Sequence, residues 1–319
     1  MAEPATNHPP LPLGPLCTVR SLEADFRRLG IAEGDVLLVH SSLSSLGWVN
    51  GGAEAVVRAL LKVLGDGTLV VPTFTDYLSA PTPESHPGVP DEWHNQIKVT
   101  MLEYDSRTSR SSGMGEIAEM VRTWPGAFRS KNDQKSFAAI GPCAHKITCR
   151  YFIDDSPFGE KSPLDMMDRL DDAEVRVLLL GVGFDKCSPF HLAESRLPEP
   201  PRTSQYYRVG VRDERNIWSK AHLVDHKCDD FEALGVAFTR DRPVTRGIVG
   251  GASCTLFSLP EAVSYAHQWF LENRTRSIAI PESPTFEECD ALGYNPSMGK
   301  QCPHPIKTLF RDPRLMAPP

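Results

Sequence analysis

A histidine and a carboxylate three residues apart, His191 and Glu194, are the residues whose types and spacing best suit acid–base chemistry. They follow an aliphatic run over residues 175–180 and the glycines Gly181 and Gly183. Positions i and i+3 share one face of a helix, so both side chains can point into one cleft. Because a histidine ordinarily changes charge between about pH 5 and 8, it can take a proton from a substrate. The pattern predicts a general base beside an anion, which suits a cationic, nucleophilic substrate.

The same residues allow a plainer interpretation. A histidine with a glutamate three residues later is also typical of a local pair without a catalytic role. Cys187 lies in the same loop, but no cysteine signature surrounds it, so we do not assign it as a nucleophile. His86, His94 and His145 lie in polar segments without the paired spacing of metal ligands, and no metal site is predicted.

The elements that carry these residues alternate between strand and helix in the first half of the chain. Ser21 is the expected N-cap of a helix through Arg28, and the long polar segment 73–100 is expected to be a functional loop. Residues 202–218 alternate like an antiparallel hairpin with its turn at Asp213-Glu214. The other expected strands are 35–40, 68–72, 136–140, 175–180 and 254–257, and the other expected helices are 54–64, 114–123, 162–170 and 260–273.

This order of elements predicts an α/β fold. We expect a central mixed β-sheet with helices on both faces and a small lid-like insertion. Residues 1–15 are expected to form a loose N-terminal arm, and residues 16–280 the main domain. Residues 281–319 are expected to be a C-terminal extension that packs on the domain or trails it.

The composition limits the partners. The chain has 319 residues, a net charge of −7 and no basic stripe, which disfavours nucleic acid and anionic membranes as partners. Its eight cysteines are scattered without a C-x-x-C pair, as in a reduced cytoplasmic protein. No segment reaches the roughly 18 apolar residues of a membrane span, and no signal pattern begins the chain. We therefore expect a cytoplasmic monomer or homodimer that acts on a small molecule.

A loop of serines and glycines, residues 41–52, follows the first predicted strand and precedes a helix. Hydroxyls and glycine amides just before a helix N-terminus favour an anion such as a phosphate. The spacing matches neither a Walker loop nor a dinucleotide fingerprint. Composition alone leaves two alternatives, a phosphate site and a flexible turn whose serines cap the local backbone.

Eight short motifs follow one another along residues 22–271. They are Val39–Gly47 with Gly51-Gly52, Gly67–Thr73, Asp105 with Thr108-Ser109, Met114–Glu119, Arg129-Ser130, Ser136–Gly141, Phe158–Leu164 and His191–Glu194. In this order they resemble the aminoglycoside 3-N-acetyltransferase family, antibiotic N-acetyltransferases that are distinct from the common GNAT fold. Each motif is short, but eight in register are a specific signal.

The resemblance implies the antibiotic N-acetyltransferase fold and transfer of acetyl from acetyl-CoA to the 3-amino group of a 2-deoxystreptamine aminoglycoside. It also implies that the loop 41–52 holds the CoA pyrophosphate, which favours the phosphate site over the flexible turn. The residues then expected to bind the CoA co-substrate are Ser41, Leu43, Ser44, Ser45, Gly47, Thr73, Ser109, Met114 and Gly115.

Within that reaction His191 is the expected general base, because an ammonium becomes a nucleophile only after it loses a proton. Ser188 is the expected donor to the oxyanion and a candidate to protonate the leaving thiolate, with Thr73 as second choice. Glu194 is expected to orient His191 or to bind an ammonium. The residues expected to contact a cationic acceptor are Asp76, Tyr77, Asp185, Asp225 and Glu194, with Asp229 and Asp230 also available.

One position departs from the family pattern. Members usually have His-Pro shortly before the Ser136–Gly141 motif, where this chain has Asn132-Asp133. An asparagine can keep a hydrogen bond but cannot titrate. Two alternatives to aminoglycoside acetylation therefore remain, an acyltransferase of the same fold with a different amine acceptor and a CoA-binding homologue without turnover.

Overall fold

The computed structural model describes residues 14–82, 86, 88–150, 156–212 and 215–274. All of them belong to one compact unit, residues 1–278. The predicted arm, residues 1–15, and the predicted extension, residues 281–319, fall almost wholly outside the described ranges, so both remain predictions.

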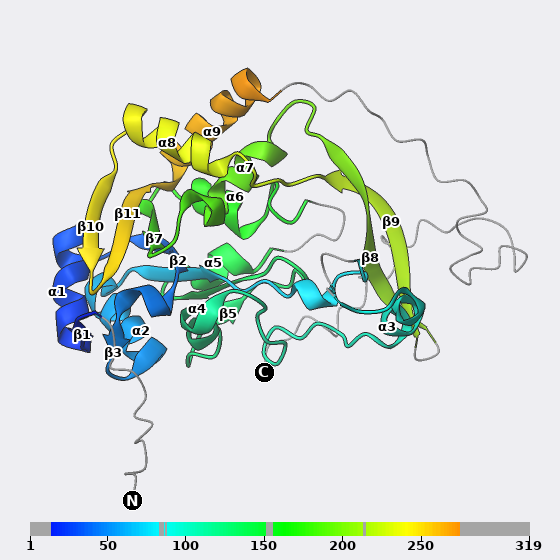
Figure 1. Cartoon of the computed structure of the whole chain (residues 1–319), viewed down its shortest axis with the longest axis horizontal. Coiled ribbons are helices and arrows are strands. Elements are labelled where there is room, and N and C mark those ends of the chain that lie inside the picture. Colours follow the sequence, from blue (N-terminus) through cyan, green and yellow to red (C-terminus); the bar gives the residue numbers. More distant parts are fainter. Residues whose placement is uncertain (1–13, 83–85, 87, 151–155, 213–214, 275–319) are drawn as a thin grey trace, which may run out of the picture. The chain divides into compact units, whose positions relative to one another are not determined.

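A seven-stranded sheet forms the centre of the described part (Figure 1). In spatial order its strands are β10 (Thr245–Val249), β11 (Ala252–Ser258), β7 (Val175–Leu180), β2 (Val36–Ser41), β4 (Thr68–Pro72), β6 (Phe137–Ile140) and β5 (Phe128–Arg129). The central strands β7, β2 and β4 are parallel, and the outer strands pair antiparallel. The predicted mixed sheet is therefore confirmed, and β4 and β7 have their predicted bounds. A short parallel pair, β1 (Leu16–Cys17) and β3 (Trp48–Val49), lies outside this sheet.

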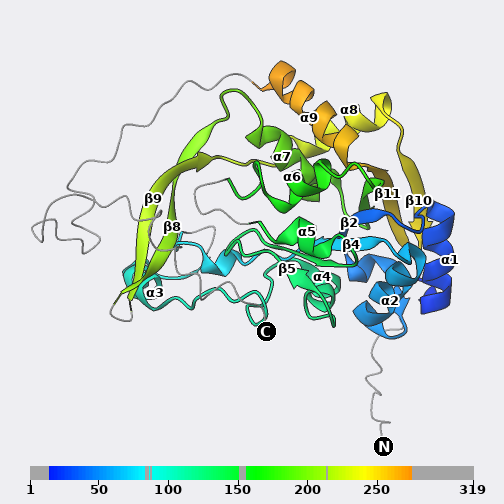
Figure 2. The ribbon, with the colours of Figure 1, turned by 180° about the vertical axis from the view of Figure 1, so that it is seen from behind.

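Helices cover both faces of the sheet, as predicted (Figure 2). Leu37 and Val39 of β2 belong to one buried cluster and Val36 and Leu38 to the other, because successive side chains of a strand point to opposite faces. The helices of the first cluster are α1 (Val19–Leu29), α2 (Gly52–Leu64) and α4 (Gly115–Arg122). Those of the second are α5 (Ala144–Thr148), α6 (Pro163–Asp168), α7 (Pro189–Ser195), α8 (Phe231–Asp241) and α9 (Leu259–Asn273).

A long antiparallel hairpin, β8 (Arg202–Arg212) and β9 (Arg215–Val224), forms a separate two-stranded sheet. This confirms the predicted hairpin and fits the predicted small insertion, whereas its expected turn at residues 213–214 lies outside the described residues. A helix, α3 (His94–Thr100), packs on β9. Trp218 Nε1 donates to the carbonyl of Lys98 at 3.0 Å, and Asn216 Nδ2 donates to that of Met101 at 2.7 Å.

The segment 73–100, which was expected to be a functional loop, contains regular structure among its described residues. It holds α3 and two 3₁₀ turns, η2 (Asp76–Leu78) and η3 (Asp91–Trp93). The reason is tertiary: the last carbonyls of α3 find side-chain donors on β9, far away in the sequence.

Two other expectations are corrected. The first helix begins earlier than predicted because Thr18 is its N-cap, and Ser21 is the partner three residues later in a reciprocal capping box. Helix α8 was not predicted, since Gly235 interrupts its apolar pattern. A side chain at Gly235 would lie 2.2 Å from the ring of Phe184, so the glycine allows that ring to pack against the helix.

Candidate active site

Three strand ends bring the candidate residues together. The parallel strands β2, β4 and β7 end at Ser41, Pro72 and Leu180. The carboxyl ends of parallel strands share one edge of a sheet, which is where α/β proteins bind ligands. Three segments therefore meet at this edge. They are residues 41–52 after β2, hereafter the serine loop, the residues after β4, and the segment that leads from β7 to α7.

His191 and Glu194, hereafter called the catalytic pair after the role that the sequence predicts for them, lie on α7. Pro189 begins this helix, and the i, i+3 spacing places both side chains on one face. His191 Nδ1 and Glu194 Oε2 are 2.5 Å apart. The Glu194 side chain is 1% exposed and that of His191 17%, so the carboxylate is buried while the imidazole reaches the surface of the site.

Aromatic rings hold the imidazole. Phe158 stacks on the His191 ring with 4.7 Å between centroids and 21° between planes, and the ring of Phe231 lies 4.8 Å away. The ring of His226 meets that of His191 edge-on at 5.3 Å. These contacts restrict the orientation of the ring, which is the condition for directional proton transfer.

Two buried histidines accompany the pair. His40, at the end of β2, lies with Nε2 3.2 Å from the hydroxyl of Ser188, and burial together with nearby His191 lowers the pKa of His40 to about 3. His226 Nε2 lies 2.8 Å from the hydroxyl of Ser195, and burial followed by the charge of His191 lowers the pKa of His226 to about 2. Both rings are therefore neutral at physiological pH. The sequence places His40 just before the serine loop, whereas its contact with Ser188 arises only in the folded chain.

Ser188, the predicted oxyanion donor, is 4% exposed and one helical turn before His191. It contacts neutral His40. Cys187 next to it is fully buried, and burial raises the pKa of its thiol far above the usual range, which removes it as a nucleophile at neutral pH.

The serine loop packs closely against the end of β7. Gly181 has φ of +67°, and a Cβ there would lie 1.7 Å from the hydroxyl oxygen of Ser45. Ser45 in turn donates to the carbonyl of Ser42 at 2.7 Å. The hydroxyls of Ser42 and Ser44 lie 3.1 Å apart in an exposed position. Their segment is a 3₁₀ turn, η1 (Leu43–Leu46), which Gly47 ends.

Met114 and Gly115, which are expected to bind acetyl-CoA, lie at the start of α4 and close to the serine loop. A Cβ on Gly115 would lie 3.8 Å from the carbonyl oxygen of Ser41, so the start of α4 lies next to the end of β2. Met114 and Leu43 are both half-buried and pack on the same apolar cluster. The start of α4 thus lies next to the end of β2, and the contact of Leu43, Met114 and Gly115 with CoA stays a prediction.

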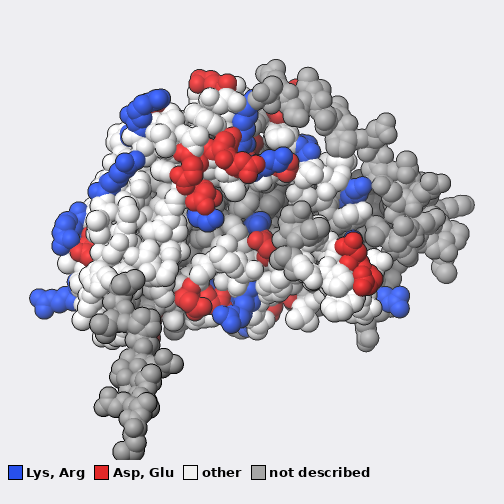
Figure 3. Space-filling view, in the orientation of Figure 1, with Lys and Arg blue, Asp and Glu red and all other residues white. Residues whose placement is uncertain are grey.

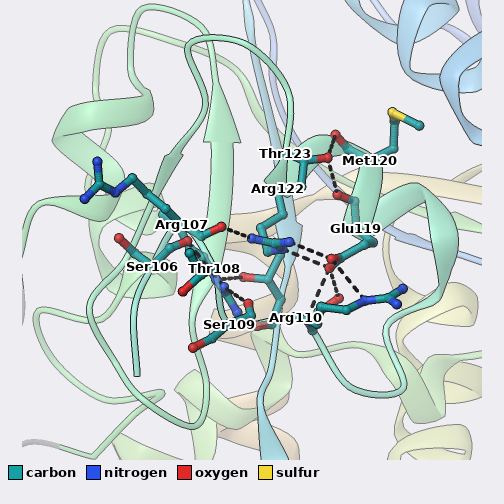
Figure 4. A network of polar contacts seen from close by, with 12 residues as sticks. Ser106, Arg107, Thr108, Ser109, Arg110, Glu119, Met120, Arg122 and Thr123 are labelled. Carbon is teal, nitrogen blue, oxygen red and sulfur yellow. Dashed lines mark hydrogen bonds and ion pairs between the residues drawn. The ribbon is translucent and has the colours of Figure 1, made fainter. Parts of the chain in front are cut away.

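Residues 105–114, hereafter called the donor loop because Ser109 and Met114 are expected to bind the acetyl donor, are held by charged side chains of the elements that follow (Figure 4). Arg122 of α4 donates to Glu119 at 2.6 and 2.9 Å and to the carbonyl of Arg107 at 2.5 Å. Glu119 also accepts from the backbone and hydroxyl of Ser111. Burial raises the pKa of Glu119, but the hydrogen bonds from Arg122 and Ser111 outweigh it and lower that pKa to about 2.

A second arginine, Arg129 of β5, fixes the donor loop from the other side. It donates to the carbonyl of Ser109 at 2.5 Å and to that of Thr73 at 2.7 Å. Thr73, predicted as a donor-binding residue, is fully buried, and its hydroxyl contacts Arg129 and Ser136 at 3.1 Å each. Arg129 thus joins the main chain at Ser109 to that at Thr73, and the hydroxyl of Thr73 is engaged by buried partners.

Four of the aspartates expected to contact the acceptor form ion pairs within the chain. On the face that Figure 3 draws, acidic and basic side chains lie next to one another. Tyr77 is 38% exposed beside Asp76. The pairs are Asp76 with Lys135 at 2.6 Å, Asp185 with Lys186 at 2.8 Å, Asp225 with Lys227 at 3.0 Å and Asp230 with Arg274 at 2.6 Å.

Asn132, where the family usually has a histidine, shapes a turn. Its side-chain oxygen accepts from the backbone N–H of Gln134 at 3.0 Å and of Lys135 at 2.6 Å. The pKa of Asp133 is raised by burial, with Arg208 of the hairpin opposing the shift. The Asn132 side chain thus fixes the turn from which Lys135 extends.

Within the described ranges, no cluster of three or more His, Cys, Asp or Glu side chains is arranged to hold a metal ion. Among the helices of the same residues, none has the length and hydrophobicity needed to cross a lipid bilayer.

A family model described as aminoglycoside 3-N-acetyltransferase matches residues 38–271. The chain is 39% identical over 263 residues to the SPbeta prophage-derived aminoglycoside N(3')-acetyltransferase-like protein YokD of Bacillus subtilis (strain 168), covering 82% of this chain and 95% of that protein. It is 31% identical over 279 residues to aminoglycoside N(3)-acetyltransferase VII of Streptomyces paromomycinus, covering 82% and 94%.

Solved structures of related proteins have a similar fold. The crystal structure of YokD matches with a TM-score of 0.75 and 37% identity, over 82% of this chain and 96% of that one. The structure of AAC-IIIb in a binary complex with CoASH matches with a TM-score of 0.67 and 26% identity, over 83% and 100%. Both similarities extend over most of the described fold.

Proposed function

The chain belongs to the aminoglycoside 3-N-acetyltransferase family, and from this premise we propose that it transfers acetyl from acetyl-CoA directly to an amine, with His191 as general base. The observation that carries the proposal is the contact between His191 Nδ1 and buried Glu194. A carboxylate accepts, so Nδ1 of the neutral ring must carry the proton, and Nε2 is left as the basic nitrogen. Among the described residues we find no hydrogen-bond partner for Nε2.

The reaction forms one N–C bond and breaks one C–S bond. The amine nitrogen attacks the thioester carbonyl, and His191 Nε2 takes the proton that the amine loses. The CoA thiolate leaves when the tetrahedral intermediate collapses. Ser188, one turn away, is the proposed donor to the oxyanion, a role worth roughly 3 kcal/mol. The proton that His191 gained returns to the thiolate, directly or through Ser188. Proton transfer of this kind contributes about a hundred- to ten-thousand-fold to the rate.

The donor site is proposed at the serine loop and the donor loop. Exposed hydroxyls at Ser42 and Ser44 and the free start of α4 at Gly115 suit the phosphates of CoA. The hydroxyl of Ser109 accepts from the backbone of Asp105 and keeps its own proton for a ligand. The complex of the relative AAC-IIIb with CoASH supports acetyl-CoA as the donor.

The proposed acceptor is the 3-amino group of a 2-deoxystreptamine aminoglycoside, which the names of relatives support. Asp76, Asp185, Asp225 and Glu194, with Tyr77, are the proposed contacts of its ammonium groups. The described cysteines are free thiols, which accords with a cytoplasmic location for this reaction.

A second acceptor class is favoured by one observation. The aspartates proposed to contact the acceptor are paired with lysines of the chain itself, and Lys135 Nζ lies 4.9 Å from the ring centroid of Phe74. Phe74 in turn contacts Phe158, the ring that stacks on His191. A polycation would have to displace these lysines, whereas an amine with a single positive charge would not. The second candidate is therefore an acetyltransferase for a less highly charged amine.

One experiment tests both. Purified protein is incubated with acetyl-CoA and a panel of 2-deoxystreptamine aminoglycosides and singly charged amino sugars, and free thiol release is followed. Because the chain has eight cysteines of its own, a reaction without acetyl-CoA gives the background. Release with aminoglycosides supports the first acceptor, and release confined to singly charged amines supports the second. Binding of acetyl-CoA without release by any amine would identify a homologue without turnover and contradict the proposal.

A further inference from the structure

Glu194 is a buried carboxylate with both oxygens engaged. One oxygen contacts His191 Nδ1. The other accepts from the guanidinium of Arg274 and from the backbone N–H of Lys227 at 3.2 Å. A carboxylate with 1% exposure is stable as an anion only when such partners replace water. Arg274 is thus the cation that compensates the charge beside the catalytic imidazole.

Arg274 is itself held on every side. Its Nε and Nη2 donate to the two carboxylate oxygens of Asp230 at 2.7 and 2.6 Å, a bidentate arrangement. Nη2 also donates to the carbonyl of Lys227 at 3.1 Å. The guanidinium carbon lies 3.8 Å from the ring centroid of Phe270. This geometry needs a planar fork with several donors, which an arginine has and a lysine lacks.

Arg274 therefore joins three elements at the catalytic pair. Arg274 follows the end of α9, and its guanidinium donates to Asp230 at the start of α8 and to Glu194 on α7. Arg274 lies just beyond the residues 38–271 that the family model matches.

We infer that Arg274 is a positioning residue for acetyl transfer, which holds Glu194 so that its carboxylate fixes the Nδ1–H form of His191. This inference rests on the proposed role of His191 as base. Arg274 does not touch the reacting atoms. Its effect passes through Glu194, whose orientation decides where Nε2 points and whose charge decides how readily the ring holds a second proton.

The charges around the imidazole give the effect a sign. His191 faces Glu194 on its own helix, His40 from β2 and His226 from the segment before α8. Lys135 and Arg274 act on the same cluster, and both oppose a further positive charge on His226. His40 and His226 are neutral, so among the described residues Glu194 is the charged group that contacts the ring, and Arg274 pairs with its other oxygen. Without the arginine, the uncompensated carboxylate would favour imidazolium over the neutral base.

The test separates charge from geometry with two substitutions. Arg274→Gln keeps a donor but removes the charge, and Arg274→Lys keeps the charge but removes the fork. Arg240→Gln is the matched control, since Arg240 pairs with Asp241 in an exposed position on α8. Values of kcat, and KM for acetyl-CoA and the amine, are measured from about pH 5.5 to 9, the range in which histidine bases titrate. Thermal unfolding checks that each variant is folded.

We expect Arg274→Gln to lower kcat by about ten- to a hundredfold, with KM for acetyl-CoA unchanged and the acidic limb of the pH profile moved to higher pH. Arg274→Lys should keep the wild-type limb and show an intermediate kcat, which a purely structural role would not produce. Arg240→Gln should match wild type throughout.

Wild-type kcat and an unmoved acidic limb in both Arg274 variants would overturn the inference, and the proposed function would stand if His191→Ala were then inactive. If Arg274→Gln does not fold, Arg274→Lys decides alone: a wild-type kcat there contradicts positioning by the fork. Wild-type turnover by His191→Ala would overturn both the proposed function and the positioning role that depends on it.

Discussion

The donor loop and the catalytic pair lie at the same edge of the sheet but are held in different ways. The donor loop is fixed mostly through its main chain: the carbonyls of Arg107 and Ser109 accept from Arg122 and Arg129. The catalytic pair is fixed mostly through side chains, His191 by Glu194 and Glu194 by Arg274.

The difference has a physical consequence. Every residue has a carbonyl, so the donor loop can change its side chains and keep its shape while the two arginines remain. A chain of side-chain contacts has no such freedom, because each member specifies the orientation of the next. We therefore expect donor binding and catalysis to respond separately to mutation.

The largest expected effect concerns the catalytic pair alone. His191→Ala should lower kcat by a hundredfold or more, because the base is lost, while KM for acetyl-CoA is unchanged. Steady-state kinetics with acetyl-CoA and the best amine of the panel measure both values. A large rise in KM for acetyl-CoA would mean that His191 also binds the donor, and the two regions would not be independent.

The reverse result is expected on the donor side. Arg122→Gln removes charged hydrogen bonds to Glu119 and to the carbonyl of Arg107, each worth about 1.5–3 kcal/mol. Part of the free energy of acetyl-CoA binding is then used to order the donor loop. The KM for acetyl-CoA should therefore rise about tenfold, with kcat nearly unchanged. Arg28→Gln, which affects an exposed pair with Asp25, is the control. A fall in kcat as large as the rise in KM would contradict the expected separation of donor binding from catalysis.

Acid should loosen the catalytic side first. The pKa of His40 and His226 falls from an ordinary 6.5 to about 3 and about 2, so the unfolded chain binds protons below pH 6.5 that the folded chain does not. The stability contributed by these neutral rings is complete above pH 6.5 and is lost as pH falls below it. The pKa of Glu119 is lowered from 4.5 to about 2. Its contribution to the free energy of unfolding is therefore complete above pH 4.5 and is lost as the pH falls toward 2.

Hydrogen exchange measures this order. At about pH 5, after correction for intrinsic rates, protection should fall in α7 relative to neutral pH, while the residues of α4 keep theirs. Loss of protection in α4 before α7 would reverse the predicted order of the two regions.

The smallest effect is expected at the departure from the family pattern. Asn132→His removes the oxygen that accepts from the backbone of Gln134 and Lys135, at a cost of about 1 kcal/mol in the free energy of unfolding. Because Lys135 pairs with Asp76, relative kcat/KM among the panel amines should change by a few-fold, with no change for acetyl-CoA. An unchanged acceptor profile together with reduced stability would show that Asn132 shapes only the turn.

Local patterns in the sequence were enough for much of the framework. The aliphatic runs of β4 and β7 predicted both strands at their observed bounds, because a strand buried on both faces needs an unbroken apolar stretch. The i, i+3 spacing predicted that His191 and Glu194 meet, since that spacing is a property of any helix. Helix α8 was missed because the reason for Gly235 is the ring of Phe184, which the local pattern does not contain.

Contacts between distant segments were decided by the tertiary structure alone. Nothing in the local sequence indicates that Arg274 reaches Glu194, 80 residues earlier, or that His40 meets Ser188. The pairing of Lys135 with Asp76 is of the same kind, and it alters the charge that an acceptor would meet. The sequence determined which groups can do chemistry, because that depends on residue type and near spacing. Packing of the sheet and its helices determined which charges and rings surround those groups, because burial and proximity arise only when the chain is folded.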